Sequence, residues 1–503
     1  MAGRPLPGGD DMIGELGCLL STALSRDGAI LDHWAGRTPF NVLRAQATNI
    51  RDRLLAGRLY PDEPVHVAIG NRATDIACIL GVWEAGGVVV PFHTSALPAT
   101  VNRLAAMTQA RFVVDAGTVE ELSTTPPPKR SLLRGAALVI LTSGSTGMPK
   151  GVVLAHDRLN GKLDVLTRLL GFTAADHVVL PLQLTFIYGL WVALLTLSTG
   201  ATLYLMPRFS PDSLRSYMDD GATVLALVPS MLRTLLPDST LFNKFPRLLL
   251  TGGETLGAHL RYAIRDIWPE TNLVDLYGLT ETGSCDFSLS NTSAITAAGS
   301  IGFPTEGIKF RIADSEQGLT GIGELQICTP FGMLGYLDDP TLTSAAFADE
   351  FFRTGDLARV RPDGLVELVG RSKEIVSRGG NKIAPQEIDQ ILCSHPAVAG
   401  ALSAGIPHPR LGETLYTIVV LKADTELTAT ELRHWLSERL ERFKLPDTLS
   451  IEACLPVGST GKASRALLRE IAIARSEARE LDPENGTGGV VGKASFCRDR
   501  PSG

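Results

Sequence analysis

The alternation of short apolar runs with helical stretches limits the fold of this chain more than any other feature. Residues 65–69 and 88–91 have the composition of buried strands, and residues 73–85 between them have that of a helix. Similar apolar runs return at residues 111–114 and 224–228. Because parallel strands are joined by crossovers that are usually helical, we expect an α/β fold with parallel-rich sheets flanked by helices.

The pattern changes twice further along the chain. From Gly299 short strands and turns indicate a β-subdomain, and after Gly370 the pattern is that of a small α+β unit. At 503 residues the chain is also too long for one ordinary domain. We therefore predict a large N-terminal domain over residues 1–370 and a small mobile C-terminal domain over residues 371–481. We expect residues 482–503, which are polar and glycine-rich, to be disordered.

Charge and cysteine usage exclude several classes of protein. The net charge is −7 with Lys and Arg dispersed, which argues against nucleic acid as a partner. Seven widely spaced cysteines without a Cys-x-x-Cys pair, and no signal-peptide pattern, predict a reduced, cytoplasmic protein. The uncharged residues 178–206 contain Pro and Gly, so we expect a buried strand, helix and strand there instead of a membrane span. His156, His259 and His395 lack metal-ligand spacing, so we predict no zinc.

A loop rich in glycine and hydroxyl groups follows the apolar residues 136–141. It reads Thr142-Ser143-Gly144-Ser145-Thr146-Gly147-Met148-Pro149-Lys150. Such a loop can present backbone N–H groups and hydroxyls to an anion, and we prefer this interpretation to a surface linker because apolar segments flank it on both sides. The Walker spacing fails, since Pro149 precedes Lys150 and Gly151 follows it. The hydrolase pattern Gly-x-Ser-x-Gly fails as well, since Ser143 stands two residues before Ser145.

The loop resembles the signature loop of the adenylate-forming superfamily, which includes acyl- and aryl-CoA ligases, peptide-synthetase adenylation domains and luciferases. The resemblance covers roughly residues 60–475 and rests on six ordered segments. It implies an enzyme that uses ATP and Mg²⁺ to adenylate a carboxylic acid and then transfers the acyl group to a thiol. The acceptor would be coenzyme A, or the phosphopantetheine of a separate carrier protein.

A second segment, Tyr277-Gly278-Leu279-Thr280-Glu281-Thr282, matches the Tyr-Gly-x-Thr-Glu signature of the superfamily. An aromatic ring can lie on a purine, and a carboxylate can share Mg²⁺ with phosphate oxygens. By the resemblance, Thr280 and Glu281 contact phosphate and Mg²⁺, and Tyr277 contacts adenine. The residues that the resemblance assigns to ATP are Thr142, Ser143, Gly144, Ser145, Thr146, Gly147, Lys150, Gly252, Gly253, Glu254, Tyr277, Gly278, Asp356 and Arg371.

The remaining segments place the ribose, the hinge and the main catalytic cation. Asp356 in Thr-Gly-Asp would accept hydrogen bonds from ribose hydroxyls, and Arg371 would reach the ribose as well. Lys373 would be the hinge on which the small domain turns. Lys462 in a Gly-Lys pair would bridge the substrate carboxylate and the α-phosphate, which makes it, with Thr280 and Glu281, a candidate catalytic residue.

The thiol side and the acid are also suggested by the resemblance. Gly379 and Gly380 lie in a segment similar to the loop that CoA ligases bring to the site for thiol attack. Phe186 stands where a histidine is common, and Phe186 and Tyr188 form a Phe-x-Tyr-Gly text similar to that of benzoate-type ligases. We therefore expect a CoA ligase for an aryl or compact to medium-chain apolar acid. The alternatives are an adenylation enzyme that loads a carrier protein and a nucleotide-binding module without turnover.

Overall fold

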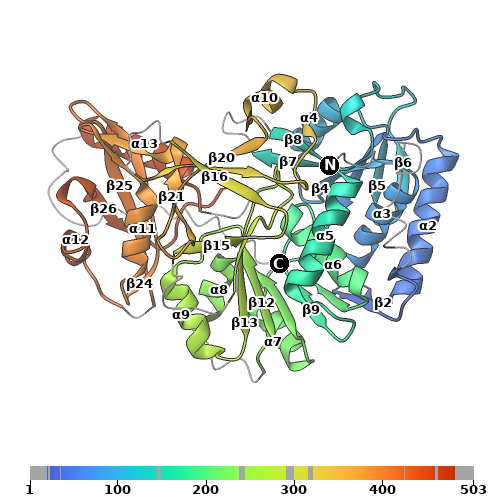
Figure 1. The fold of residues 1–503 in the computed structure, drawn as a ribbon, viewed down its shortest axis with the longest axis horizontal. Coiled ribbons are helices and arrows are strands. Elements are labelled where there is room, and N and C mark those ends of the chain that lie inside the picture. Colours follow the sequence, from blue (N-terminus) through green and yellow to red (C-terminus); the bar gives the residue numbers. More distant parts are fainter. Residues whose placement is uncertain are drawn as a thin grey trace, which may run out of the picture.

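The structure is a computed structural model that describes residues 20, 23–33, 35–143, 149–236, 244–290, 299–314, 321–423, 425–458 and 463–481. A large N-terminal domain occupies the centre and right of Figure 1, and a small C-terminal domain lies at the left. The large domain contains two sheets and the small domain contains one. This arrangement agrees with the predicted α/β fold class.

A seven-stranded sheet forms one half of the large domain. Its order is β18-β8-β7-β4-β3-β5-β6, and β3 pairs in parallel with both β4 and β5. β4 also runs parallel to β7, whereas β7 and β8 form an antiparallel hairpin. The strands are β3 (Pro64–Ile69), β4 (Val88–His93), β5 (Phe112–Asp115), β6 (Thr118–Glu121), β7 (Ala136–Ser143), β8 (Pro149–Ala155) and β18 (Gly335–Tyr336).

A fourteen-stranded sheet forms the other half, in the order β16-β17-β20-β21-β15-β14-β13-β12-β11-β9-β10-β1-β2, with β19 beside β20. Along the sheet, the pairs β1–β10, β10–β9, β9–β11, β11–β12 and β12–β13 are parallel. The pairs β13–β14, β14–β15, β15–β21, β21–β20, β20–β17 and β17–β16 are antiparallel. The strands are β1 (Ala29–Asp32), β2 (Gly36–Pro39), β9 (His177–Leu180), β10 (Thr202–Leu205), β11 (Val224–Leu227), β12 (Leu248–Gly252), β13 (Asn272–Tyr277), β14 (Phe287–Leu289), β15 (Ser300–Pro304), β16 (Lys309–Asp314), β17 (Gly323–Cys328), β19 (Phe347–Ala348), β20 (Phe351–Val360) and β21 (Val366–Arg371).

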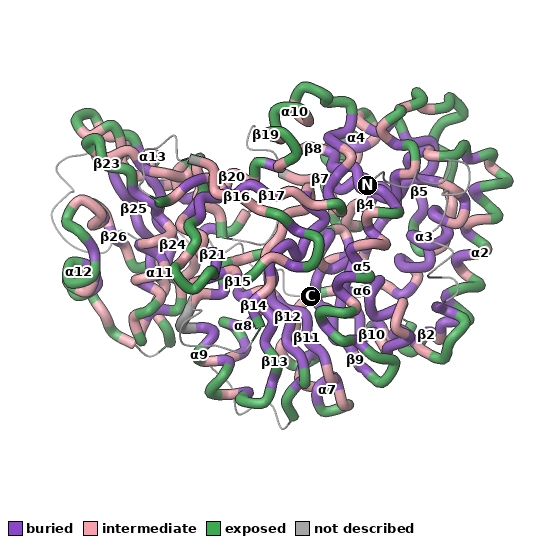
Figure 2. Tube along the Cα trace, in the orientation of Figure 1, coloured by how far each residue is buried: buried purple, intermediate pink, exposed green. Residues whose placement is uncertain are grey.

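Helices cover both sheets and enclose the core, which is purple in Figure 2. α5 packs on β8, α6 packs on β9 and β10, and the two helices contact each other, so they join the sheets. α6 is apolar on nearly all sides because it is buried between them. The helices are α2 (Phe40–Ala56), α3 (Ala73–Glu84), α4 (Pro98–Thr108), α5 (His156–Leu170), α6 (Ile187–Thr199), α7 (Pro211–Asp219), α8 (Pro229–Leu235), α9 (Ala258–Ile267) and α10 (Pro340–Ala345), with a 3₁₀ turn, η1, at Ser131–Leu133.

The small domain is built on a five-stranded sheet, in the order β23-β22-β25-β24 with β26 beside β25. Side chains alternate along β25, so Leu415 and Val419 pack under α11 and α12 while Tyr416 and Ile418 pack under α13. The elements are η4 (Ser372–Glu374), β22 (Val376–Arg378), β23 (Asn381–Ile383), α11 (Pro385–Cys393), β24 (Val398–His408), β25 (Gly412–Leu421), α12 (Ala429–Ser437), η5 (Arg442–Lys444), β26 (Thr448–Ile451) and α13 (Arg465–Leu481).

The fold corrects one expectation. The apolar spacing of residues 1–60 predicts a helical lead-in, but residues 29–39 form β1 and β2, because β1 pairs in parallel with the distant β10. The strands after Gly299, expected as a β-subdomain, pair with one another in antiparallel fashion and join the large sheet through β14 and β15. Residues 178–206 divide into β9, α6 and β10 as expected, and no helix in the described part of the chain is long and apolar enough to cross a membrane. The expected tail, residues 482–503, lies outside the described residues.

Candidate active site

The β7–β8 hairpin carries the predicted phosphate loop. β7 runs to Ser143 and β8 begins at Pro149, and Thr142 and Lys150 are register partners. The prediction of a loop over residues 142–150 was therefore wrong at both ends, because the strand pairing continues into it. The predicted phosphate-binding residues Gly144, Ser145, Thr146 and Gly147 lie outside the described residues.

One tyrosine, Tyr336, contacts both Lys150 and Glu281. The hydroxyl of Tyr336 donates a hydrogen bond to Glu281 Oε1 at 3.1 Å, and Lys150 Nζ lies 5.2 Å from the centre of the same ring. Burial and the neighbouring Glu281 carboxylate raise the pKa of Tyr336. The hydroxyl is therefore protonated and donates to the carboxylate.

The segment after β13 turns tightly, and glycine at position 278 makes this possible. A Cβ at Gly278 would lie only 2.2 Å from the backbone nitrogen of Cys285. Ser284 and Cys285 have backbone φ angles of +68° and +54°, which residues other than glycine rarely adopt. Thr280 and Glu281 are half-buried on this turn. The turn therefore holds both side chains on a constrained backbone.

A buried charge pair supports the same turn. Lys162 on α5 is 2% exposed, and its Nζ lies 3.7 Å from Asp286 Oδ1 and 3.2 Å from the carbonyl oxygen of Cys285. Thr282 donates to the other oxygen of Asp286. Burial raises the pKa of Asp286 to about 6, although Lys162 acts in the opposite direction. Lys162 on α5 therefore restrains the position of the turn through its contacts with Asp286 and Cys285.

Three of the predicted ATP ligands, one each on β13, β20 and β21, contact one another through their side chains, although β14 and β15 lie between β13 and β21 in the sheet. Asp356 on β20 is the register partner of Arg371 on β21, and Arg371 Nε lies 2.9 Å from Asp356 Oδ1. The hydroxyl of Tyr277 donates to Asp356 Oδ2 at 2.6 Å. Burial raises the pKa of Tyr277, and the Asp356 carboxylate raises that of Arg371. The cluster thus combines a tyrosine donor, a carboxylate and a guanidinium.

The segment after β12 lies beside β13. Gly252 is pressed against β13, since a Cβ there would lie 2.6 Å from a carbonyl oxygen of that strand, and Gly253 has a φ of +78°. Glu254 Oε1 accepts a hydrogen bond from Ser230 Oγ at 2.8 Å, and Arg233 lies 3.4 Å from Oε2. Ser230 and Arg233, both on α8, therefore hold the Glu254 side chain against that helix.

The predicted acyl-pocket residues begin α6. Phe186 is the N-cap of the helix and is 44% exposed, whereas Tyr188 packs against Trp191 with their ring centres 5.6 Å apart. Among the described residues, nothing forms a hydrogen bond with the buried Tyr188 hydroxyl, the Trp191 indole nitrogen or the Thr251 hydroxyl. Burial raises the pKa of Tyr188. A polar ligand that forms hydrogen bonds with these buried groups would be bound more tightly, because the groups have no other partner among the described residues.

The small domain contacts the large one beside the segment after β12. Gln386 on α11 donates through Nε2 to Thr255 Oγ1 at 2.8 Å. The predicted hinge residue Lys373 lies in η4, directly after β21, and Gly379 and Gly380 form the β22–β23 turn with φ angles of +54° and +85°. Lys462 lies outside the described residues.

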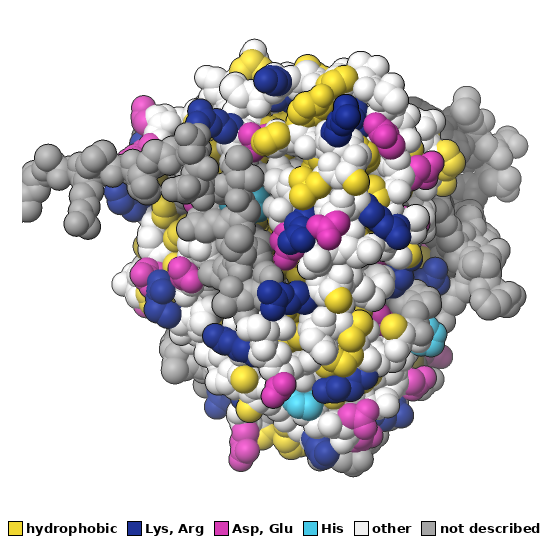
Figure 3. Space-filling view, turned by 90° about the vertical axis from the view of Figure 1, so that its right-hand side faces the viewer, with side chains coloured by type: hydrophobic (Ala, Val, Ile, Leu, Met, Phe, Trp, Pro, Cys, Tyr) yellow, Lys and Arg dark blue, Asp and Glu magenta, His cyan; other side chains and the backbone are white. Residues whose placement is uncertain are grey.

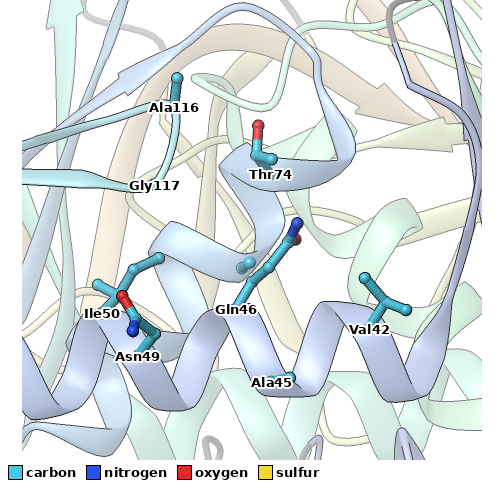
Figure 4. A pocket seen from close by; sticks show the side chains of 9 residues that line it. Val42, Ala45, Gln46, Asn49, Ile50, Thr74, Ala116 and Gly117 are labelled. Carbon is cyan, nitrogen blue, oxygen red and sulfur yellow. The ribbon is translucent and has the colours of Figure 1, made fainter.

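A pocket of about 380 Å³ lies elsewhere, between α2, α3 and the β5–β6 turn (Figure 4). Val42, Gln46 and Thr74 are among its lining residues, and none of the predicted site residues is. The face on this side of the molecule shows basic and acidic side chains interspersed with apolar ones (Figure 3). We place the candidate active site at the β13–β20–β21 junction and not in this pocket.

Sequence reasoning missed Tyr336 and Lys162. Tyr336 lies 55 residues from Glu281 in the chain, and no local pattern marks it. Lys162 gave a usable signal, because it falls beside Leu159, Leu163 and Leu166 on the apolar face of α5, where an unpaired lysine would be costly.

Comparisons with known proteins give consistent results. The model of the family described as AMP-binding enzyme matches residues 116–337, and that of the AMP-binding enzyme C-terminal domain matches residues 387–462. A feruloyl-CoA synthase from Amycolatopsis sp. is 31% identical over 85% of this chain and 90% of its own. A malonate–CoA ligase from Arabidopsis thaliana is 28% identical over 78% of this chain and 76% of its own.

A solved structure shares the fold. The crystal structure of ATP-bound MatB from Rhodopseudomonas palustris superposes with a TM-score of 0.80, at 24% identity, over 90% of this chain and 98% of that one. The names of the two sequence relatives indicate different acids, malonate for the Arabidopsis enzyme and a feruloyl group for the Amycolatopsis enzyme.

Proposed function

The chain belongs to the family of AMP-binding enzymes and is an adenylate-forming CoA ligase, and we propose that its described site activates an aryl or compact apolar carboxylic acid. In the first step a carboxylate oxygen attacks the α-phosphorus of ATP, and the bond to the β-phosphate oxygen breaks to release pyrophosphate. In the second step the sulfur of coenzyme A attacks the acyl carbon, and the bond to the AMP oxygen breaks. The thiol proton passes to solvent.

The Tyr277–Asp356–Arg371 cluster is the main support for ATP binding at this site. Asp356 is 4% exposed and fixed by two donors, so its orientation is set before ATP binds. Each carboxylate oxygen can accept more than one hydrogen bond, so Asp356 retains acceptor capacity for the vicinal hydroxyls of ribose. The Tyr277 ring beside it offers an aromatic surface to adenine.

Charge stabilisation explains the other residues. Negative charge builds up on the phosphate oxygens during the first step, and fixed cations lower the energy of that state. We assign this role to Lys150 on β8 and to Lys462, with Thr142 and Thr280 as hydroxyl donors. Glu281 suits Mg²⁺, which is commonly held by one or two carboxylates together with substrate phosphates, and the metal would neutralise polyphosphate charge there.

The acid class rests on the start of α6. We place the acid beside Phe186 and Tyr188, where the aromatic rings favour an aryl or compact apolar body. The Tyr188 hydroxyl and the Trp191 indole are both donors without partners among the described residues, so a substituent that accepts hydrogen bonds would bind better than hydrogen at this position.

The decisive experiment is carboxylate-dependent ATP–pyrophosphate exchange over aryl, short, medium and long acids. We expect exchange with aryl or compact acids, and thioester formation when coenzyme A is added. A thioester formed only on a holo-carrier protein would instead identify a carrier-loading enzyme. Absence of exchange across the whole panel would contradict the ligase assignment and favour a nucleotide-binding module.

The small domain serves the second step in this proposal. Rotation about Lys373 would bring the Gly379–Gly380 turn to the site, where two residues without a Cβ leave the backbone open to the pantetheine arm. We propose that the boundary between the domains lies between residues 370 and 371, where the sequence pattern changes.

A further inference from the structure

We propose that Tyr336 is a positioning residue that couples the phosphate-binding lysine to the metal-binding carboxylate. The inference rests on the proposed function, in which Lys150 contacts the polyphosphate and Glu281 holds Mg²⁺. It adds a residue that neither motif contains and that touches both of them.

The backbone around Tyr336 is tied to both motifs. Tyr336 pairs with Val152 on β8, and the backbone nitrogen of Leu337 donates to the carbonyl oxygen of Gly151 at 2.8 Å. On the other side, the backbone nitrogen of Met333 donates to the carbonyl oxygen of Glu281 at 2.7 Å. Residues 333–337 therefore form a short strap between the strand that follows the phosphate loop and the turn that carries Glu281.

The side chain of Tyr336 repeats this connection. It is 5% exposed, its hydroxyl donates to Glu281 Oε1 at 3.1 Å, and Lys150 Nζ lies 5.2 Å from its ring centre. A cation at this distance from a ring is attracted by the negative face of the ring. One side chain thus restrains both a cation and an anion.

The arrangement keeps both charges available. Among the residues that the structure describes, no carboxylate forms an ion pair with Lys150, and the ring of Tyr336 holds the ammonium without neutralising it. The hydroxyl engages only one oxygen of Glu281, which leaves the other for a metal ion. A direct Lys150–Glu281 ion pair would satisfy each charge and weaken the attraction of both for MgATP, so an aromatic spacer suits the site better than a polar one.

The test is ATP binding measured by calorimetry without any acid, once with Mg²⁺ and once with EDTA. Tyr336→Phe keeps the ring but removes the hydroxyl, so we expect MgATP to bind roughly tenfold more weakly and ATP in EDTA to bind within about twofold of wild type. Tyr336→Leu also removes the ring, so we expect it to weaken ATP binding in EDTA as well. The matched control is Tyr204→Phe, which removes another buried hydroxyl, the one 3.1 Å from His177 Nδ1.

The outcomes separate cleanly. Unchanged MgATP binding by Tyr336→Phe, or equal weakening in both media, would overturn the coupling role, and equal weakening by Tyr204→Phe would reduce the effect to lost stability. If wild type binds ATP in neither medium, the proposed function itself fails. Thermal melting of each variant establishes that it is folded under the conditions of the titration.

Discussion

Asp356 faces Arg371 across two neighbouring antiparallel strands, with Arg371 Nε 2.9 Å from Asp356 Oδ1. Tyr277, which is 79 residues away in the chain, donates to the other oxygen at 2.6 Å. The ribose-binding carboxylate that we propose is therefore built by three strands of one sheet. Its position depends on sheet pairing more than on any single loop.

Replacement of this carboxylate should affect ATP binding selectively. We expect Asp356→Asn to raise the KM for ATP in the exchange assay roughly 100-fold, since charge-assisted hydrogen bonds to two hydroxyls are lost. The KM for the acid should change much less. Asp363→Asn, at the exposed turn between β20 and β21, is the control and should behave as wild type. Equal changes in both KM values would argue against a ribose contact.

The Lys162–Asp286 pair should contribute to stability. Lys162→Met leaves a carboxylate without its buried cation, so we expect the free energy of unfolding in urea to fall by roughly 3–5 kcal/mol. Asp286→Asn in the same chain should recover part of that loss, because the amide carries no charge. If the double variant is as unstable as the sum of the single ones, the two groups do not act as a pair.

The sequence predicts local features of the fold well and distant contacts poorly. The apolar spacing predicts helices over residues 40–55 and from residues 385 and 429, and α2, α11 and α12 begin at these positions, because each has one apolar face that is buried against neighbouring elements. β1 was missed, since it is only four residues long and lies in the sheet between the short β2 and the distant β10. For the same reason, the motifs predicted Glu281 and Lys150 but not Tyr336, whose role depends on a contact between distant segments.

The contact between the domains should affect the two steps differently. Gln386→Ala removes the hydrogen bond to Thr255, so we expect one half-reaction to become faster and the other slower, each by roughly two- to fivefold. Single-turnover pyrophosphate release and thioester formation from supplied acyl-adenylate measure the two steps. Gln390→Ala, one turn further along α11, is the matched control. Parallel changes in both rates would contradict a role in domain orientation.

The role of Lys462 stays a prediction from the sequence. Lys462→Ala should abolish adenylation but leave thioester formation from supplied acyl-adenylate intact, because the lysine is proposed to act only on the α-phosphate and the carboxylate. Pyrophosphate exchange and thioester formation are measured on the same preparation. Equal loss of both steps would remove this lysine from the proposed mechanism.

Acid should destabilise the large domain through a buried histidine. His66 on β3 is 1% exposed, and its Nε2 lies 2.8 Å from Thr108 Oγ1. Burial lowers its pKa from 6.5 to about 4, so between these values the unfolded chain binds more protons than the folded one. The contribution of His66 to the free energy of unfolding is therefore fully present above pH 6.5 and falls as the pH decreases, by about 2 kcal/mol between pH 7 and 5.

His66→Gln should reduce that pH dependence, because glutamine can still bond to Thr108 but does not titrate. His156, whose pKa burial also lowers to about 4, adds a slope of the same sign, whereas Asp286, whose pKa burial raises to about 6, acts in the opposite direction. The difference between wild type and variant therefore isolates His66. Urea unfolding at pH 7, 6 and 5 measures the difference between wild type and variant. An identical slope in His66→Gln and wild type would mean that His66 becomes protonated without unfolding, and that the β3–α4 contact opens locally.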